Sequence, residues 1–535
     1  MIKYILIIIM FDLISYSQVS QYWASRYNHT SNGSDEGTDL AIDASGYVYV
    51  TGTSVAGFTL SDIVTIKYGL TGGQMWEQRY TGSGGNYPDK GISIAIDPAG
   101  NIIVGGTSYG QNTRNDFVIL KYSPSGSLIW ENRITGPDGL DDDLNKLVVD
   151  ASGNIYAAGE SVGVSTHSDF LTVKLNSSGV IQWTKRYNYW NDDEDLTDLV
   201  IDNSGNIYIT GFGNRPESGY GLDFITIKYN PSGIEQYIYN FNLGGNEQSA
   251  SINVDQSGNA YICGTTDAYG TGTDFLTFSI GPSGNFRWFQ RNTGSGINND
   301  KAVGLVCDAS GNVYVAGSKF QNVGNDIVVL KYNSSGQQQW EKVQPLGGDD
   351  NAVSIINDYS GNIVVTGYTN AFGTNYDYYT FSYNTSGVQL WEIRYNGPTG
   401  NNDIVKKVKA DPLGGIYVTG RSEGIEWDYA TVKYANVTSV EPVSNELPSQ
   451  YRLSQNYPNP FNPATNINFS LPVNSYVSLE IFDINGMVVS ELVNELLNAG
   501  DYDISFDASS LSSGLYFCRL SAGSFTDTKK MILIK

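Results

Sequence analysis

Carboxylates are the plentiful reactive side chains of this 535-residue sequence, which contains 55 Asp and Glu but only two His. One set recurs in register, eight residues before the Asp that opens each copy of a phrase such as DASGNIYAAG (150–159). Its members are Asp35, Asp89, Asp142, Glu194, Glu247, Asp300, Asp350 and Asp403. Because Ca²⁺ takes oxygen ligands, one hypothesis is a ring of carboxylates that concentrates cations or binds calcium.

A second set of acids recurs at the start of the third expected strand of each unit: Asp62, Asp116, Asp169, Asp223, Asp274, Asp326, Asp377 and Asp428. The alternative to a cation site is that each acid accepts hydrogen bonds from local backbone N–H groups where a strand begins. We favour this structural interpretation, because a structural demand repeats with the fold whereas a binding site usually breaks the symmetry.

The symmetry breaks in two consecutive loops, GPDGLDDDLN (136–145) and YNYWNDDEDLTD (187–198), which carry extra acids and aromatic residues. The candidate binding patch consists of Asp141, Asp142, Asp143, Tyr189, Trp190, Asp192, Asp193, Glu194 and Asp195, with Trp427 from a loop expected on the same face. Paired carboxylates beside aromatic rings are typical of glycosidases. The loops are short, however, so the simpler alternative is a solvated acidic surface without a function.

Other kinds of chemistry have little support in the sequence. His29 and His167 lie outside any metal-binding motif, and no phosphate-binding G-x-x-x-x-G-K-[ST] occurs. The formal net charge of −24 argues against nucleic acid or an anionic membrane as a direct partner. We therefore expect a non-enzymatic protein without a cofactor, unless the carboxylate ring binds calcium.

The acids are positioned by a repeat whose opening Asp falls at 43, 97, 150, 202, 255, 308, 358 and 411, at intervals of 50 to 54 residues. Each unit has the pattern of four short strands, with the Asp and Gly of the phrase in a hairpin turn. Repeated four-stranded units are typical of a β-propeller. The sequence therefore predicts an all-β fold with an eight-bladed propeller over 18–437.

The last unit lacks a fourth strand, and YWASRYN (22–28) matches the fourth strands of the other units. We expect this N-terminal strand to close the last blade. Seven Trp occupy one position of the repeat, and their recurrence indicates packing: Trp23, Trp76, Trp130, Trp183, Trp288, Trp340 and Trp391.

The two ends of the chain differ from the repeat. Residues 1–17 have the pattern of a signal peptide, with a basic start, an apolar run and small residues at 15 and 17; a retained N-terminal anchor is the alternative. No other segment is a candidate membrane span. A polar linker (438–450) precedes 451–535, whose alternating strands and Gly turns predict a small immunoglobulin-like β-sandwich.

Two family resemblances add to this interpretation. The D-x-S-G-N-x-Y and D-F-x-T-x-K-Y phrases resemble the β-propeller repeats of secreted bacterial proteins, which implies a fold and no single activity. Residues 451–535 resemble the type A C-terminal sorting domain of the type IX secretion system, through NYPNPFNP (456–463), SGLYF (513–517) and the terminal Lys529 and Lys530. That resemblance implies the type IX machinery as a partner and an extracellular or surface-attached product.

The hypothesis is a secreted or surface-attached propeller that binds an extracellular protein or glycan. The alternatives are a polysaccharide-active enzyme, a glycosidase or lyase, and a passive surface or adhesion component. The sequence leaves open the ligand, the oligomeric state, cleavage of the sorting domain and whether the product is anchored or released.

Overall fold

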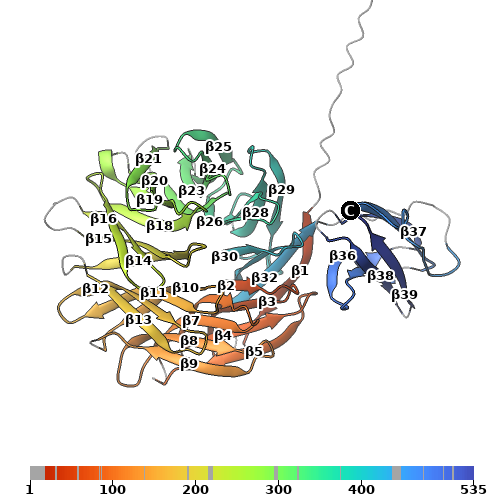
Figure 1. The fold of residues 1–535 in the computed structure, drawn as a ribbon, viewed down its shortest axis with the longest axis horizontal. Coiled ribbons are helices and arrows are strands. Elements are labelled where there is room, and N and C mark those ends of the chain that lie inside the picture. Colours follow the sequence, from red (N-terminus) through yellow and green to blue (C-terminus); the bar gives the residue numbers. More distant parts are fainter. Residues whose placement is uncertain are drawn as a thin grey trace, which may run out of the picture. The chain divides into compact units, whose positions relative to one another are not determined.

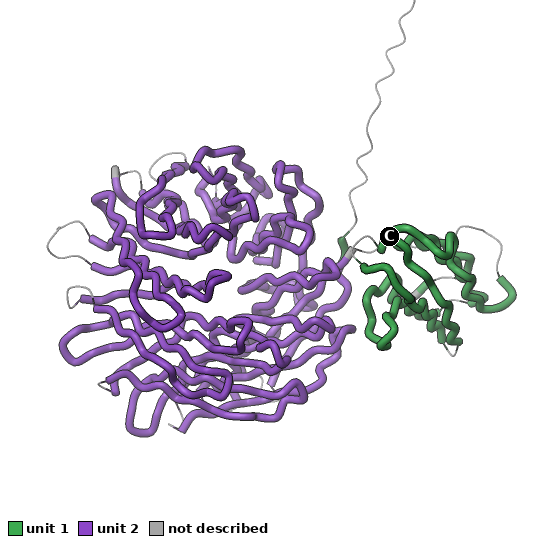
Figure 2. The backbone as a smooth tube through the Cα atoms, in the orientation of Figure 1, with its two compact units in different colours: residues 1–20, 436–535 green, residues 21–435 purple. Residues whose placement is uncertain are grey.

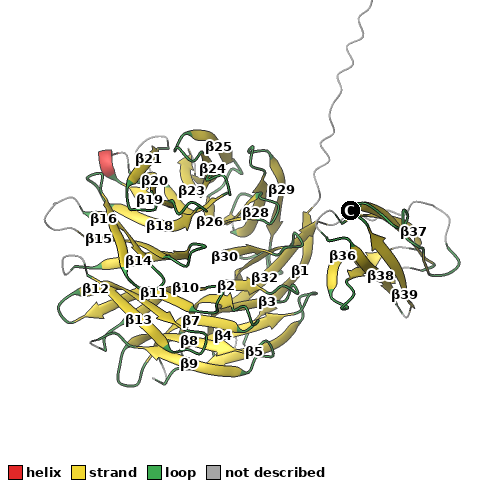
Figure 3. Cartoon of the chain, in the orientation of Figure 1, coloured by secondary structure: helices red, strands yellow, loops and turns green. Residues whose placement is uncertain are grey.

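The computed structural model describes residues 19–535, apart from 30–32, 57–59, 84, 86, 138, 189–191, 215–220, 271, 295–298, 322–323, 374, 437–447, 474, 498, 509–510 and 524. The described chain is all-β, as predicted, and its only helical segment is the 3₁₀ turn η1 (Ala268–Gly270) (Figure 3). It divides into two compact units, Gln21–Ala435 and a second that contains Asn436–Lys535 (Figure 2). The predicted signal peptide and most of the predicted linker lie outside the described residues.

Eight four-stranded antiparallel sheets make up the first unit. Their first strands are β2 (Asp35–Ile42), β6 (Lys90–Ile96), β10 (Asp142–Val149), β14 (Glu194–Ile201), β18 (Glu247–Val254), β22 (Lys301–Cys307), β26 (Asp350–Asn357) and β30 (Asp403–Ala410). The second strands are β3 (Val48–Val55), β7 (Ile102–Tyr109), β11 (Ile155–Gly163), β15 (Ile207–Asn214), β19 (Ala260–Thr266), β23 (Val313–Gln321), β27 (Ile363–Thr369) and β31 (Ile416–Glu423).

The third strands follow without a crossover. They are β4 (Ser61–Tyr68), β8 (Asn115–Tyr122), β12 (His167–Leu175), β16 (Leu222–Tyr229), β20 (Asp274–Ile280), β24 (Gly324–Tyr332), β28 (Asp377–Tyr383) and β32 (Trp427–Asn436). The fourth strands are β5 (Gln74–Tyr80), β9 (Leu128–Ile134), β13 (Ile181–Tyr187), β17 (Glu235–Phe241), β21 (Phe286–Asn292), β25 (Gln338–Gln344), β29 (Gln389–Tyr395) and β1 (Val19–Tyr27). In the last sheet it is β1, from the N-terminal end of the described chain, that pairs with β32.

The repeated phrase forms the turn between the first and second strands. In the third sheet, one carboxylate oxygen of Asp150 accepts hydrogen bonds from the backbone N–H groups of Ser152 (2.9 Å) and Asn154 (2.8 Å). The other oxygen accepts bonds from the Asn154 amide and the Tyr156 hydroxyl. Gly153 has a φ of 78°, which favours glycine at this position. The opening Asp thus stabilises the hairpin rather than taking part in chemistry.

The repeated Trp packs each sheet against the next. Trp183 on β13 lies 6.2 Å, between ring centroids, from Tyr156 of its own sheet and 6.2 Å from Tyr229 of the following sheet. Its indole N–H donates a hydrogen bond to the Pro231 carbonyl, also in the following sheet. Trp76, Trp288 and Trp340 make the same two ring contacts and the same kind of hydrogen bond. These indoles are packing residues, because each joins two sheets.

Trp23 on β1 makes the equivalent contacts between the last sheet and the first. Its ring lies 6.2 Å from Tyr417 on β31 and 6.1 Å from Tyr68 on β4, and its N–H donates to the Leu70 carbonyl. Each first strand contacts the first strand of the following sheet, and β30 contacts β2. The first strands lie toward the middle of the unit and fourth strands such as β9 and β13 lie at its periphery (Figure 1).

The second unit contains two sheets, in the orders β33-β34-β37 and β36-β35-β38-β39. Their strands are β33 (Arg452–Leu453), β34 (Ala464–Leu471), β35 (Ser475–Phe482), β36 (Val488–Leu497), β37 (Gly500–Asp507), β38 (Gly514–Ala522) and β39 (Phe525–Leu533). Both sheets contribute to one hydrophobic core, with Phe469 and Tyr502 from one sheet and Ile481, Cys518 and Met531 from the other.

Candidate functional site

The eight carboxylates proposed as a cation ring each lie at or just before the start of a first strand, and their side chains are buried. Asp142 accepts a hydrogen bond of 2.6 Å from the backbone N–H of Gly136, in the loop that leads into β10. Asp35, Asp89, Glu247, Asp300 and Asp403 accept equivalent bonds from the loops before their own strands. These contacts are the ones that the structural interpretation of the set expects, since they satisfy backbone donors where a strand begins.

Six of the eight acids at the starts of the third strands pair with an Arg that the sequence analysis did not single out. This Arg lies three residues after the repeated Trp, on the neighbouring fourth strand. Arg133 donates to Asp116 (2.8 Å), to the Ser108 carbonyl (2.8 Å) and to the Ser108 hydroxyl (2.7 Å). The equivalent pairs are Arg79–Asp62, Arg186–Asp169, Arg291–Asp274, Arg394–Asp377 and Arg26–Asp428.

Burial changes the titration of the first set. It raises the pKa of Asp142, Asp350 and Asp403 to about 6, and the third-strand Asp of the preceding sheet adds to the shift. For Asp142 that neighbour is Asp116. The raised pKa values therefore follow from packing between sheets. Within the described ranges, no cluster of three or more His, Cys, Asp or Glu has the arrangement of a metal site.

The acidic residues of the candidate patch lie just before or at the start of the first strands of two consecutive sheets, β10 and β14. Asp141 is partly exposed and pairs with Arg114 (3.1 Å), whereas Asp143 accepts a hydrogen bond from the Asn115 amide. Asp192 accepts from the Asn214 amide and Asp193 from the backbone N–H of Ser168. Asp142 and Glu194 are buried, and Asp195 is partly buried.

Of the aromatic members of that patch, only Trp427 is among the described residues. Tyr189 and Trp190 lie outside the described residues. Trp427 begins β32 in the last sheet, where the Arg421 guanidinium lies 4.2 Å from its ring centre. Since the acids belong to the third and fourth sheets, Trp427 is not part of the same cluster.

Glu160 on β11 is an acid of this region that the sequence analysis missed. It pairs across the strands with Asp143 on β10. Burial, together with the charges of Asp195 and Asp143, raises the pKa of Glu160 to about 7. The corresponding position varies among the units, with Thr53 and Thr107 in the first two, so the available signal is that Glu160 is its one acid. A carboxyl group that titrates near 7 can act as a general acid.

A cavity of about 290 Å³ lies among the first strands of all eight sheets. Each first strand contains a β-bulge, and the residues at the bulges line the cavity. In β10 the bulge lies between Leu144 and Lys146, so that Asn145 has no partner in the register with β11. In each sheet, the residue directly after the bulge lies four positions before the Asp of the repeated phrase and lines the cavity. This cavity ring consists of Asp39, Ser93, Lys146, Asp198, Ser251, Gly304, Ser354 and Lys407.

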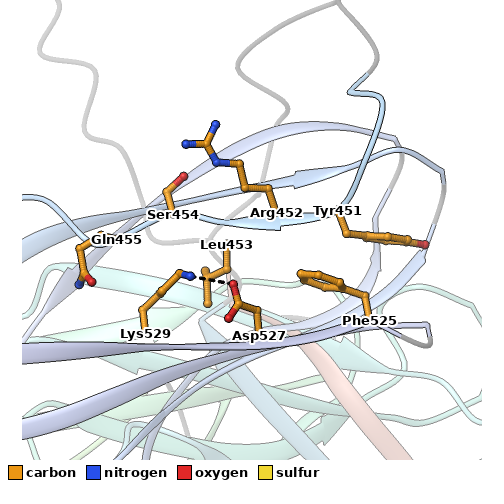
Figure 4. A pocket seen from close by; sticks show the side chains of 8 residues that line it. All are labelled: Tyr451, Arg452, Leu453, Ser454, Gln455, Phe525, Asp527 and Lys529. Atoms are coloured by element: carbon orange, nitrogen blue, oxygen red, sulfur yellow. Dashed lines mark ion pairs between the residues drawn. The ribbon is translucent and has the colours of Figure 1, made fainter.

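The second unit carries an open groove of about 440 Å³ beside β33 and β39. Figure 4 shows the stacked rings of Tyr451 and Phe525 at one end of the groove and the ion pair between Lys529 and Asp527 along its floor. Lys529 was expected to be a sorting-domain residue, and its side chain lines this groove.

Two family models match parts of the chain. Residues 455–535 match the secretion system C-terminal sorting domain, and residues 98–128 match a domain of unknown function (DUF5122) described as a beta-propeller. The sorting domain indicates export by the type IX secretion system, to the cell surface or the extracellular space, and an interaction with that machinery. Among the described residues, no helix is long and apolar enough to span a membrane.

A curated relative is the uncharacterized WD repeat-containing protein L264 of Acanthamoeba polyphaga mimivirus, 26% identical over 208 residues. The match covers 29% of this chain and 15% of that much longer protein.

The chain is also similar to solved structures. PorZ of Porphyromonas gingivalis, a surface component of the type IX secretion system, is 12% identical, with 93% of this chain and 74% of PorZ covered and a TM-score of 0.32. Sqt1 from Chaetomium thermophilum is 10% identical, with 78% and 100% covered and a TM-score of 0.45. An ulvan lyase is 11% identical, with 69% and 95% covered and a TM-score of 0.42. These likenesses are too remote to bear on function.

Proposed function

We propose that this protein is a non-enzymatic binding module outside the cell, built as a closed eight-bladed propeller. Its C-terminal unit, for which an immunoglobulin-like sandwich is the proposed form, directs export. Closure is supported by Trp23, which contacts one Tyr of the last sheet and one Tyr of the first. Trp183 makes the equivalent pair of contacts between the third and fourth sheets. Contact between β30 and β2 supports the same order of eight blades.

The observation that carries a binding role is the cavity ring. The other recurring positions are occupied by packing or turn residues: the phrase Asp bonds its own hairpin, the Trp joins sheets, and six of the eight third-strand Asp residues pair with an Arg. The cavity ring instead differs from sheet to sheet and lines a hollow. A ligand without eightfold symmetry needs different side chains from different sheets, and the cavity ring provides them.

The test is an array of glycans and extracellular proteins, probed with the purified exported chain. Specific binding without chemical change of the captured ligand supports the proposal. The absence of any specific capture, or turnover of a captured glycan, contradicts it.

A polysaccharide-active enzyme is the second candidate, because Glu160, with a pKa of about 7, lies opposite Asp143 in the acidic region. Turnover of an array glycan that disappears in Glu160→Gln and persists in Glu131→Gln would favour this candidate. Glu131 is a suitable control because it lies on the fourth strand β9.

A further inference from the structure

The cavity ring has two unlike sides. The charged side comes from five sheets and contains Asp39, Lys146, Asp198 and Lys407, with Ser93 between Asp39 and Lys146 in sheet order. The side formed by the fifth, sixth and seventh sheets contains only Ser251, Gly304 and Ser354 at the same position. Short apolar residues of the same sheets, such as Val303 and Val353, also line the cavity.

Both aspartates of the ring are already engaged by the protein. Asp39 accepts hydrogen bonds from the backbone N–H of Ile94 (3.1 Å) and the hydroxyl of Ser93 (3.2 Å). Asp198 accepts the equivalent bonds from Ile252 (3.1 Å) and Ser251 (2.9 Å). These two carboxylates therefore fix the neighbouring first strands, and their charge is partly compensated before any ligand arrives.

The lysines of the cavity differ in their partners. Lys146 lies 3.5 Å from Asp198, and Lys406 pairs with Glu36 at 2.7 Å. For Lys407, no carboxylate of the described residues lies within ion-pair distance. The Lys407 ammonium therefore supplies a positive charge without a direct counter-ion, in a chain whose formal net charge is −24.

We propose that the cavity binds the carboxylate of a single-ring sugar acid, with Lys407 as its ion-pair partner and Lys146 beside it. This inference rests on the proposed binding function and names the ligand class for the same site. The carboxylate of the ligand supplies the negative counter-charge that the Lys407 ammonium lacks. Charge-assisted hydrogen bonds are stronger than neutral ones. Ser354 lines the hollow, and its hydroxyl can bond a sugar hydroxyl. The hydroxyls of Thr38 and Thr197 donate to the carbonyls of Gly91 and Thr210, so toward a ligand they can only accept.

The size of the cavity limits the ligand. Its volume of about 290 Å³ is at the small end of the range for ligand pockets, about 300–1,000 Å³. One sugar ring therefore suits the cavity better than an oligosaccharide does.

The surroundings of Lys407 change its titration. The charge of Lys146, followed by burial, lowers the pKa of Lys407 to about 8. Asp39 and Asp198 act in the opposite direction, and Lys409 adds to the lowering. A bound carboxylate stabilises the charged ammonium, so binding at pH 8 should be accompanied by proton uptake.

The experiment is isothermal titration of the purified full chain with D-glucuronate, D-glucose and inorganic sulfate. We expect one glucuronate per chain, bound at least tenfold more tightly than either glucose or sulfate. At pH 8, the measured heat should depend on the ionisation enthalpy of the buffer, because protons are taken up. Glucuronate binding no tighter than sulfate or glucose, or no binding at all, overturns the proposal.

Substitutions of Lys407 test whether it is the ion-pair partner of the ligand. Lys407→Met should weaken glucuronate binding at least tenfold and abolish the proton uptake, whereas Lys407→Arg, which keeps the charge, should retain most of the affinity. Lys301→Met is the matched control, because Lys301 is an exposed lysine of another first strand. Melting temperatures verify that each variant is folded. Unchanged binding by folded Lys407→Met overturns the assignment, and array binding that persists in that variant leaves the proposed function standing.

Discussion

The substitution Trp23→Ala tests whether the N-terminal strand is part of the ring. Trp23 is only 8% exposed, contacts Tyr417 on β31 and Tyr68 on β4, and donates a hydrogen bond of 3.0 Å to the Leu70 carbonyl. Replacing a buried large aromatic residue with Ala costs about 3–5 kcal/mol. A loss of about 4 kcal/mol corresponds to a change of about a thousandfold in the unfolding equilibrium.

The assay is urea unfolding followed by far-ultraviolet circular dichroism, with Trp183→Ala as the matched variant. Trp183 makes the same contacts between the third and fourth sheets, so a closed ring predicts similar losses for the two substitutions. If β1 were a loosely attached arm, Trp23→Ala would behave as a surface substitution and cost less than about 0.5 kcal/mol. That result, with a large loss for Trp183→Ala, would refute the closure scheme.

Three further predictions concern a buried ion pair, the titration of Glu160 and the sorting domain. Arg133→Met should destabilise the first unit by about 3–5 kcal/mol in the same urea assay, because it leaves the buried Asp116 without its ion-pair partner. Arg114→Met breaks an exposed pair and should cost less than about 1 kcal/mol. Equal costs for the two variants would contradict this prediction. Glu160 has a folded pKa of about 7 against an ordinary 4.5, so its contribution to stability is lost as the pH rises through 7, and Glu160→Gln should raise the stability by about 1–3 kcal/mol at pH 8 and by little at pH 4.5. A gain of the same size at both pH values would contradict that sign. Removal of residues 451–535 should abolish appearance of the protein in the surface and medium fractions, as measured by immunoblotting, and undiminished export would contradict the role of the sorting domain.

The repeat itself could be predicted because its signals are local. Asp150 and Gly153 lie in one five-residue turn, and their spacing alone indicates a hairpin. The match of YWASRYN to other fourth strands located β1 correctly beside β32. The sorting domain was recognisable because its Pro-rich opening is distinctive.

The candidate site could be predicted only in part, because the important pairs are distant in sequence. Arg133 and Asp116 are 17 residues apart and meet only when β8 pairs with β9. Recurrence in the sequence also points to acids that are present in every unit, whereas the members of the cavity ring change from Asp39 to Lys407 around the eight sheets. The residues four positions before each phrase Asp can be read from the sequence, but only the fold shows that they line one cavity.

The measurement that tests the central claim most directly is electron microscopy of the purified exported chain, with particles averaged in the view along the ring axis. The closed eight-bladed propeller predicts eight spokes of equal length around one central hole, with β1 resolved as the outermost strand of the last blade. An open arc, a ring with a different number of spokes, or a last blade of three strands would contradict the account.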